Sequence, residues 1–257
     1  MTYTLEEVKK KTLEYFGGDD LATNVWIDKY CLTNLNEEFI EDSPLMMYKR
    51  LAEEFSRIEK KYSNSVSYEE IYKLFFEQIL LPGGSLLFGI GNNYSISSLG
   101  NCFVIGNTSD SYGGICQTDQ EQAQLMKRRA GVGHDISHLR PANSKVTNAA
   151  GTSTGASSFM HRFSNTTREV AQNGRRGALM LTMDINHPDV KQFITAKDDL
   201  TKITGANISV KVDDKFMSLV ENKEFYAQSV DDAVKTWNKL IHQAWKTAEP
   251  RYWDLVA

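Results

Sequence analysis

The chain has 257 residues, of which 41% are hydrophobic and 24% are charged, the composition of an ordinary globular protein with one or two domains. Its 29 basic and 33 acidic residues give a net charge of -4, which offers no electrostatic case for a nucleic-acid partner. The opening residues, MTYTLEEVKKKTLEYF, mix charged with apolar side chains, so we expect neither a signal peptide nor a membrane span.

The first eighty residues have the pattern of helices. Ser43 is a candidate N-cap with Pro44 at the first helical position, and Ser67 with Glu70 predicts a capping box ahead of IYKLFFEQILL. The run LPGGSLLFGIGNN then breaks the helical period. We therefore expect a helical domain over residues 1–80 and a second domain over residues 81–257.

Beyond residue 81, short apolar runs alternate with amphipathic segments. CFVIG, HDISHL, GALMLTMDI and NISVKV have strand character, and helices fit TDQEQAQLMKRR, ASSFMHRFSNTTREVAQN, HPDVKQFITAK and VDDAVKTWNKLIHQAWKTA. Thr118 and Glu121 predict a capping box for the first of these helices. Because strands separated by such helices need crossover connections, the sequence predicts an α/β fold with a mainly parallel sheet.

The three cysteines, Cys31, Cys102 and Cys116, are odd in number and lack CxxC spacing. This pattern argues against a disulfide scaffold and a zinc site, and it fits a reducing, cytoplasmic environment. Cys102 stands in CFVIG, a run typical of a buried strand, where a free cysteine packs like a small hydrophobic residue. Taken alone, Cys102 is therefore predicted to be a packing residue.

Other motifs have a structural and a functional interpretation. His134 and His138 are expected on one face of a strand, but without a third ligand they predict no metal site. The segments NGRRGALM, TGAN and RPANSKVTNAAGTSTG are polar enough to hold an anion or another ligand. Turn chemistry alone also explains each of them, so both interpretations stay open.

The order of six segments is more informative than any one of them: GGSLLFGIG, SLGNCFVIGN, DSYGGI, QLMKRRAGVGHDISHLRP, NAAGTSTGASSFMHRFSNTTREVAQNGRRGALML and TGANISVKVDDKFM. In this order they resemble the large catalytic subunit of ribonucleotide reductases. YFGGDDLATNVWIDKY and RLAEEFSRIEKKY are similar to its branch close to the adenosylcobalamin-dependent, class II enzymes. The resemblance implies a helical N-terminal domain followed by about half of a ten-stranded α/β barrel.

The resemblance gives Cys102 a catalytic role. It implies that Cys102 is one of two thiols that reduce the ribose and end as a disulfide, with the partner on a neighbouring strand. Cys31 and Cys116 match no functional cysteine and stay predicted packing residues. Contacts to the ribonucleotide substrate are implied for Cys102 itself and for Ser85, Asn101, Ala130, Gly131 and Asn207.

The resemblance also implies an allosteric site for a deoxynucleoside triphosphate effector at the interface of a homodimer. The matching positions are Asp110, Ser111, Arg140 and Lys145, in which an Asp holds the sugar hydroxyl and an Arg pairs with phosphate. Residues 142–150 match a first specificity loop, and residues 199–207 match a second, which relays effector identity to base choice.

Parts of the family's chemistry are missing from the sequence. No NPCGE-like motif, which carries the radical cysteine and a glutamate, occurs, and neither do the second redox cysteine and the C-terminal pair that a thioredoxin-type reductant serves. The chain is expected to depart from the family at RYWDLVA. Three explanations stay open: a naturally split subunit, a truncated or interrupted gene product, or a fragment. On the first, which we favour, the C-terminal half of the catalytic subunit is an obligatory partner that carries the radical site.

The leading hypothesis is the N-terminal portion of a ribonucleotide reductase catalytic subunit, active when that half completes it. The radical source is adenosylcobalamin or a metal-containing small subunit, and the substrate is a ribonucleoside diphosphate or triphosphate. The alternative is a non-catalytic deoxynucleotide-binding regulatory protein or an inactive fragment.

Overall fold

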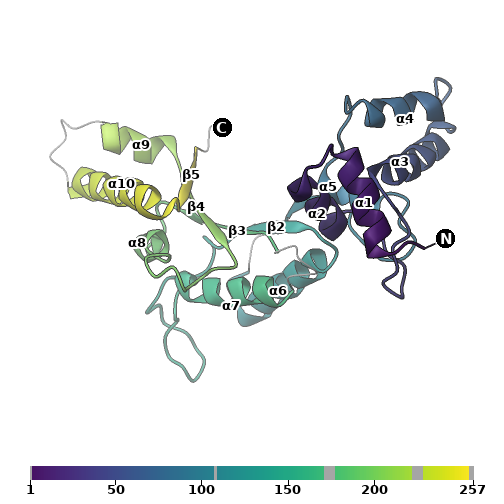
Figure 1. Ribbon diagram of the computed structural model, residues 1–257. Helices are drawn as coiled ribbons and strands as arrows, with labels where there is room; N and C mark the ends of the chain where they lie inside the picture. Colours follow the sequence, from purple (N-terminus) through teal and green to yellow (C-terminus); the bar gives the residue numbers. More distant parts are fainter. Residues whose placement is uncertain (1, 107–108, 171–176, 222–227, 255–257) are drawn as a thin grey trace. The chain divides into compact units, whose positions relative to one another are not determined.

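The computed structural model describes residues 2–106, 109–170, 177–221 and 228–254 (Figure 1). The chain divides into two compact units. The first contains residues 2–101 and 128–130, and the second contains Cys102–Lys127 and the described residues from Gly131 onward. Each unit is described by itself below. The expected domain boundary near residue 81 stays a prediction.

The first unit is helical. Its helices are α1 (Leu5–Tyr15), α2 (Asp20–Lys29), α3 (Pro44–Glu59), α4 (Tyr68–Phe76) and α5 (Gly84–Gly89). The capping box of Ser67 and Glu70 at the start of α4 is confirmed, because each side chain bonds the other residue's backbone N–H. Ser43 does precede α3, but its hydroxyl donates to Asp42 Oδ1 at 2.8 Å instead of capping the helix.

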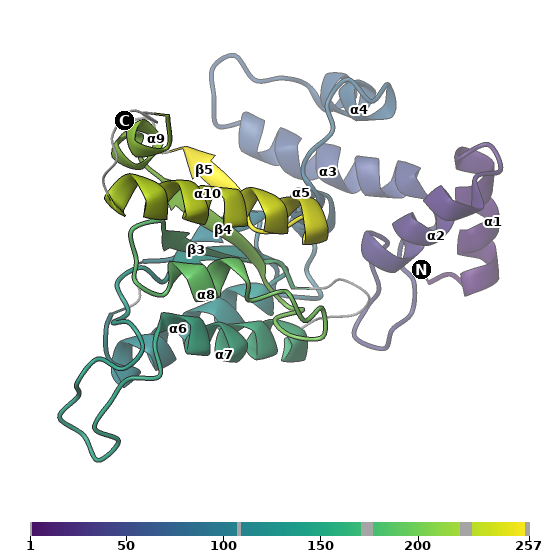
Figure 2. The same ribbon diagram turned by 90° about the vertical axis from the view of Figure 1, so that its left-hand side faces the viewer.

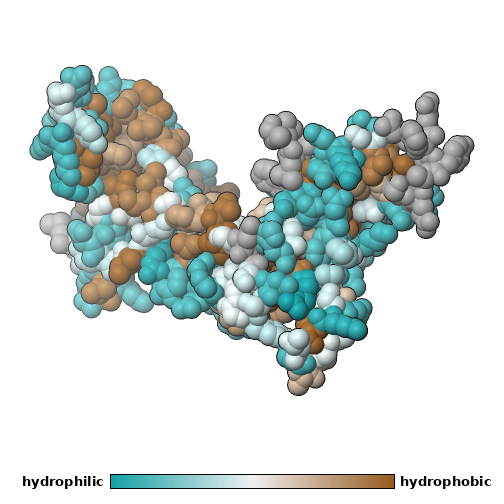
Figure 3. Space-filling model, turned by 180° about the vertical axis from the view of Figure 1, so that it is seen from behind, coloured by the Kyte–Doolittle hydropathy of each residue, from teal (hydrophilic) through white to brown (hydrophobic). Residues whose placement is uncertain are grey.

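Apolar side chains are exposed on this unit at the end of α4 and just after it. Phe76, Ile79, Leu80 and Leu81 are each about half exposed or more. Figure 3 shows hydrophobic surface at the upper left, where its view brings α3 and α4.

A buried ion pair joins three parts of the first unit. Arg50 on α3 donates from Nε to Glu41 Oε1 at 2.7 Å, and Glu41 Oε2 accepts the backbone N–H of Leu32 at 3.1 Å. The Arg50 guanidinium also donates to the carbonyl oxygens of Leu87 and Ile90, at the end of α5. Every charged atom of this pair therefore has a partner, as burial requires.

Glu41→Gln is expected to destabilise the first unit by about 3 kcal/mol, because it leaves the buried guanidinium without its counter-charge. Glu54→Gln is the matched control, since Glu54 pairs with Arg57 on the exposed surface of α3, where such pairs contribute under about 1 kcal/mol. Urea unfolding of both variants measures the difference. Equal losses from the two substitutions would contradict the role given to Glu41.

The second unit is built on a five-stranded sheet in the order β1-β2-β3-β4-β5, with every pair parallel. The strands are β1 (Cys102–Val104), β2 (Gly131–Asp135), β3 (Leu179–Asp184), β4 (Asn207–Val212) and β5 (Arg251–Asp254). The prediction of an α/β fold with a parallel sheet is confirmed. The segment NISVKV forms β4 with the predicted bounds.

Helices make the crossovers between these strands: α6 (Tyr112–Met126), α7 (Ala156–Glu169), α8 (Val190–Ile194), α9 (Asp214–Glu221) and α10 (Gln228–Thr247). Parallel strands in sequential order with right-handed crossovers place successive helices on the same side. Figures 1 and 2 show α6, α7, α8 and α10 along one face of the sheet. This is the layering of a barrel wall, and the core lies between that face and the helices.

The predicted burial of Cys102 is wrong. Cys102 and Val104 are exposed on β1 because they share the sheet face opposite to Phe103. Phe103 is in register with the core residues Val132 and Leu179, so Cys102 and Val104 point away from the core between sheet and helices. Cys116, predicted as a packing residue, is exposed on α6, whereas Cys31 is buried as predicted.

Two local predictions in the second unit are also wrong. Helix α6 begins at Tyr112, where the Ser111 hydroxyl accepts the N–H of Gly114 at 3.0 Å, so Thr118 lies inside the helix and caps nothing. Strand β2 ends at Asp135, so His134 and His138 do not share a strand face. In the first case Ser111 caps the helix earlier in the chain, and in the second Asp135 Oδ1 accepts the N–H of Ser137 in a turn that follows the strand.

His134 lies buried in the core of the second unit. Its ring stands edge-on to Phe163, with 4.5 Å between the centroids, and Nε2 is 3.2 Å from Gln122 Oε1. The amide nitrogen of Gln122 already donates to Phe163 O and Thr167 Oγ1, so Oε1 must accept and His134 carries its proton on Nε2. Burial lowers the pKa of His134 to about 4.

The free energy of unfolding should therefore fall as the pH drops from 6.5 towards 4, because the unfolded chain then binds a proton that folded His134 does not. The contribution of His134 to this slope is at most about 1.4 kcal/mol per pH unit. Urea titrations over this range should show a smaller slope for His134→Leu. The exposed His138→Leu is the control and should keep the wild-type slope; a wild-type slope in both variants would refute the assignment.

Candidate functional site

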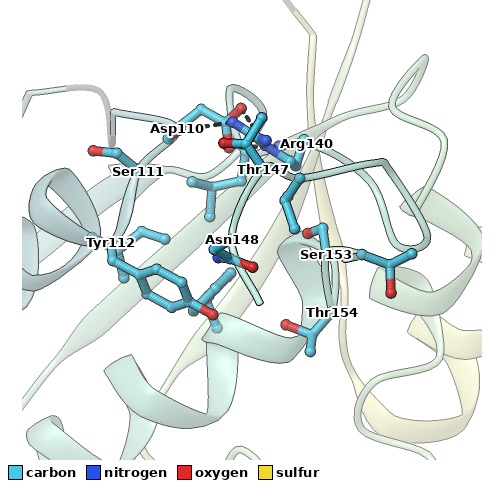
Figure 4. Close-up of a pocket in the computed structure, with 13 residues that line it drawn as sticks. Asp110, Ser111, Tyr112, Arg140, Thr147, Asn148, Ser153 and Thr154 are labelled. Carbon is cyan, nitrogen blue, oxygen red and sulfur yellow. Dashed lines mark hydrogen bonds and ion pairs between the residues drawn. The ribbon is translucent and has the colours of Figure 1, made fainter. Parts of the chain in front are cut away.

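A pocket of about 250 Å³ lies in the second unit, where the start of α6 meets the chain on both sides of the 142–155 loop (Figure 4). Apolar side chains, including Ile115, Leu139 and Phe159, form part of the lining. The rest is polar, and includes Asp110, Ser111, Arg140, Thr147, Asn148, Ser153 and Thr154. A pocket with an apolar wall and a few converging polar groups is the usual form of a small-molecule site.

An ion pair holds the charged groups of the pocket in place. Arg140 Nε donates to Asp110 Oδ2 at 2.8 Å, the Arg140 backbone N–H donates to Oδ1 at 3.2 Å, and Nη2 donates to the Asp110 carbonyl at 3.3 Å. Both side chains are more than a third exposed, so this pair adds little stability. Its effect is to orient a guanidinium and a carboxylate together at the pocket.

The start of α6 also faces the pocket. Ser111 is its N-cap, and Tyr112 and Ile115 of its first turn line the wall. Gly114 is required there, because a Cβ at this position would lie 2.3 Å from the Cβ of Ser109. The N-terminus of a 15-residue helix carries a partial positive charge, which favours an anionic ligand.

The 142–155 loop, which folds into a small hairpin, forms another side of the pocket. Lys145 and Thr152 make an antiparallel bridge, the Ser153 N–H donates to Ser144 O at 2.8 Å, and the Val146 N–H donates to Gly151 O at 3.1 Å. This folding turns Thr147 and Asn148 towards the pocket (Figure 4).

Three of the four predicted effector residues, Asp110, Ser111 and Arg140, therefore line one pocket. Lys145 lies on the same loop but outside the lining. The sequence did not single out the other polar lining residues individually: Tyr112, Thr147, Asn148, Thr152, Ser153 and Thr154. The unusual length of the polar loop was the signal that contained most of them.

The predicted substrate residues divide between the two units. In the first, Ser85 lies buried on α5 and its backbone N–H donates to Asn101 Oδ1 at 2.9 Å, whereas its hydroxyl has no partner among the described residues. A Cβ at Gly83 would lie 2.2 Å from Asn101 Nδ2, so a side chain there would displace the Asn101 amide. Ala130 also belongs to the first unit and is buried.

In the second unit, Cys102 and Gly131 are direct neighbours in register on β1 and β2. Asn207 begins β4, two strands from β2, and is exposed. The thiol of Cys102 forms no disulfide. Its neighbour in register on β2 is Gly131, so the predicted partner sulfur does not lie opposite Cys102 on β2. The roles of all six residues stay predictions.

The remaining expectations concern an anion site, a metal site and a membrane span. Residues 173–176 of the predicted anion site in NGRRGALM lie outside the described residues. In the described part of the chain, no group of three or more His, Cys, Asp or Glu side chains is placed to hold a metal ion. None of the described helices is long and apolar enough to cross a membrane.

Comparison with known proteins gives consistent matches. The family described as "Ribonucleotide reductase, barrel domain" matches residues 100–253. The chain is 34% identical over 192 residues to a vitamin B12-dependent ribonucleoside-diphosphate reductase of Thermoplasma acidophilum, a match covering 68% of this chain and 24% of that protein. A protein of the same name from Mycobacterium tuberculosis is 36% identical over 143 residues, covering 55% and 20% of the two chains.

A solved structure shares the fold. It is the class Id ribonucleotide reductase alpha subunit of Actinobacillus ureae, with a TM-score of 0.69 at 16% identity, over 90% of this chain and 39% of that one. The chain thus spans about a quarter of the length of the curated relatives named above. Since the family match runs through residues 251–253, the expected departure at RYWDLVA is wrong for its first three residues, which belong to β5.

Proposed function

We propose a function for this chain, which belongs to the ribonucleotide reductase barrel-domain family. It is the N-terminal portion of a catalytic subunit that reduces ribonucleotides. The observation that carries this proposal is the pairing of an exposed thiol, Cys102 at the start of the parallel sheet, with the family match over that sheet. The names of two relatives support a ribonucleoside diphosphate as the substrate.

In this proposal Cys102 supplies one of two thiols. The C2′–O bond of the ribose breaks and a C2′–H bond forms, the oxygen leaves as water, and the two thiols lose two electrons and two protons to form a disulfide. The second thiol and the radical cysteine come from the C-terminal half, because the sequence contains no NPCGE-like motif. A second copy of the chain and a thioredoxin-type reductant are further proposed partners.

The pocket beside Arg140 is proposed to bind the deoxynucleoside triphosphate effector. A carboxylate such as Asp110 accepts hydrogen bonds from sugar hydroxyls, and the Arg140 guanidinium donates to phosphate oxygens in a forked geometry. The positive end of α6 adds to the attraction for the anionic part of the nucleotide.

The names of the relatives point to vitamin B12 as the radical source of the complete protein. The buried histidines do not fit a corrin ligand: His134 lies edge-on to Phe163, and both ring nitrogens of His187 are bonded, to Leu139 O and to the Asp189 N–H. Neither of these two buried histidines is therefore proposed as a cobalamin ligand.

Arg140→Ala is expected to raise the dissociation constant for the preferred deoxynucleoside triphosphate by about tenfold or more, the effect of losing charge-assisted hydrogen bonds. Arg162→Ala is the matched control, since Arg162 pairs with Asp119 at 2.9 Å between α6 and α7 outside the pocket lining. Calorimetric titration with all four deoxynucleoside triphosphates measures both. Absence of binding to the wild-type chain would contradict the assigned pocket.

Cys102→Ser is expected to abolish deoxynucleotide formation when the chain is completed by a polypeptide that supplies the C-terminal half, with adenosylcobalamin and a dithiol present. Cys116→Ser changes the other exposed cysteine and should leave turnover unchanged. Turnover that survives Cys102→Ser would remove its catalytic role. Nucleotide binding without any turnover in the completed wild type would favour a non-catalytic, regulatory protein.

A further inference from the structure

A buried carboxylate behind the pocket holds both ends of the loop that lines it. Asp189 follows β3, is only 6% exposed and does not line the pocket. Its Oδ1 accepts the N–H of Ala142 at 3.1 Å, and its Oδ2 accepts the N–H of Ala156 at 2.9 Å. Both ends of the loop formed by residues 143–155 are therefore bonded to the same side chain.

The second of these contacts replaces a helix cap. Ala156 is the first residue of α7, and its N-cap, Gly155, makes no side-chain cap bond. A carboxylate from another element thus occupies the N-terminus of α7, where negative charge is stabilised. Gly155 has φ +87, and a Cβ there would lie 2.6 Å from Asp189 Oδ2 and 2.7 Å from the nitrogen of Ala142. Only glycine permits this three-way contact.

His187 extends the same anchor to the chain before the loop. Its Nδ1 accepts the backbone N–H of Asp189 at 3.0 Å, so the ring proton is on Nε2, which donates to Leu139 O at 2.8 Å. Leu139 and Ala142 flank Arg140, so the backbone on both sides of the pocket's guanidinium is fixed by this pair.

We propose that Asp189, supported by His187, is a positioning residue of the effector pocket: it sets the base of the 142–155 loop and thereby the placement of Arg140, Thr147 and Asn148. It acts through backbone contacts and does not touch the ligand. This inference rests on the proposed function, because the ligand considered is the deoxynucleoside triphosphate.

The test compares Asp189→Asn with Asp213→Asn in the 257-residue chain. Asp213 accepts the Phe216 N–H at 2.7 Å near the start of α9 and the Asn186 side-chain amide at 3.1 Å, so its substitution removes similar bonds from residues that do not line the pocket. Asp189→Asn should speed amide hydrogen exchange in residues 143–154 without nucleotide, and raise the dissociation constant for the preferred deoxynucleoside triphosphate, each by about tenfold. Exchange in α10 and the affinity of Asp213→Asn should stay at wild-type values.

Gly155→Ala provides a second route to the same contact if Asp189→Asn fails to fold by circular dichroism. Unchanged exchange of the loop in the folded variant would overturn the proposal, and so would an equal rise throughout the second unit, which marks general destabilisation. A wild-type chain that binds none of the four nucleotides, with faster loop exchange in the variant, would reject the proposed ligand and leave the anchor standing.

Discussion

Parallel strand pairing is the constraint on which the second unit depends. Each strand must be left and re-entered by a crossover, so all the segments that follow the strands emerge at the same edge of the sheet. Asp110 follows β1, Arg140 follows β2 and Asp189 follows β3. The pocket and its anchor are thus three successive strand-to-helix connections that the sheet brings together, although eighty residues separate their ends in the sequence.

Much of this architecture was predictable from local patterns. The apolar period of α10, the Ser67–Glu70 capping box and the run NISVKV each carry their signal within a few residues, and each appears where expected. The class of sheet followed from the lengths of the helices between strands. The signal for each of these features lies within a few consecutive residues, and packing against distant segments did not change the helix or strand that forms there.

Other features depend on neighbours that the sequence does not reveal. Cys102 stands in an apolar run typical of a core strand, but its side chain lies on the sheet face opposite to Phe103 and the core, which leaves it exposed. At the pocket, Asp110 and Arg140 came from a family resemblance, whereas Asp189 had no local signal. Its role appears only when Ala142 and Ala156, which lie far from it along the chain, are seen to share one carboxylate.

The order of the strands bears on how the second unit assembles. Each described strand after β1 pairs with the strand that precedes it in the chain, so none of these five strands has to be inserted between two others already in place. A strand that is synthesised later can therefore pair with its predecessor without displacing a strand already in the sheet. Parallel pairing is slow to form because its contacts are distant in sequence, and sequential order keeps each of those distances to a single crossover.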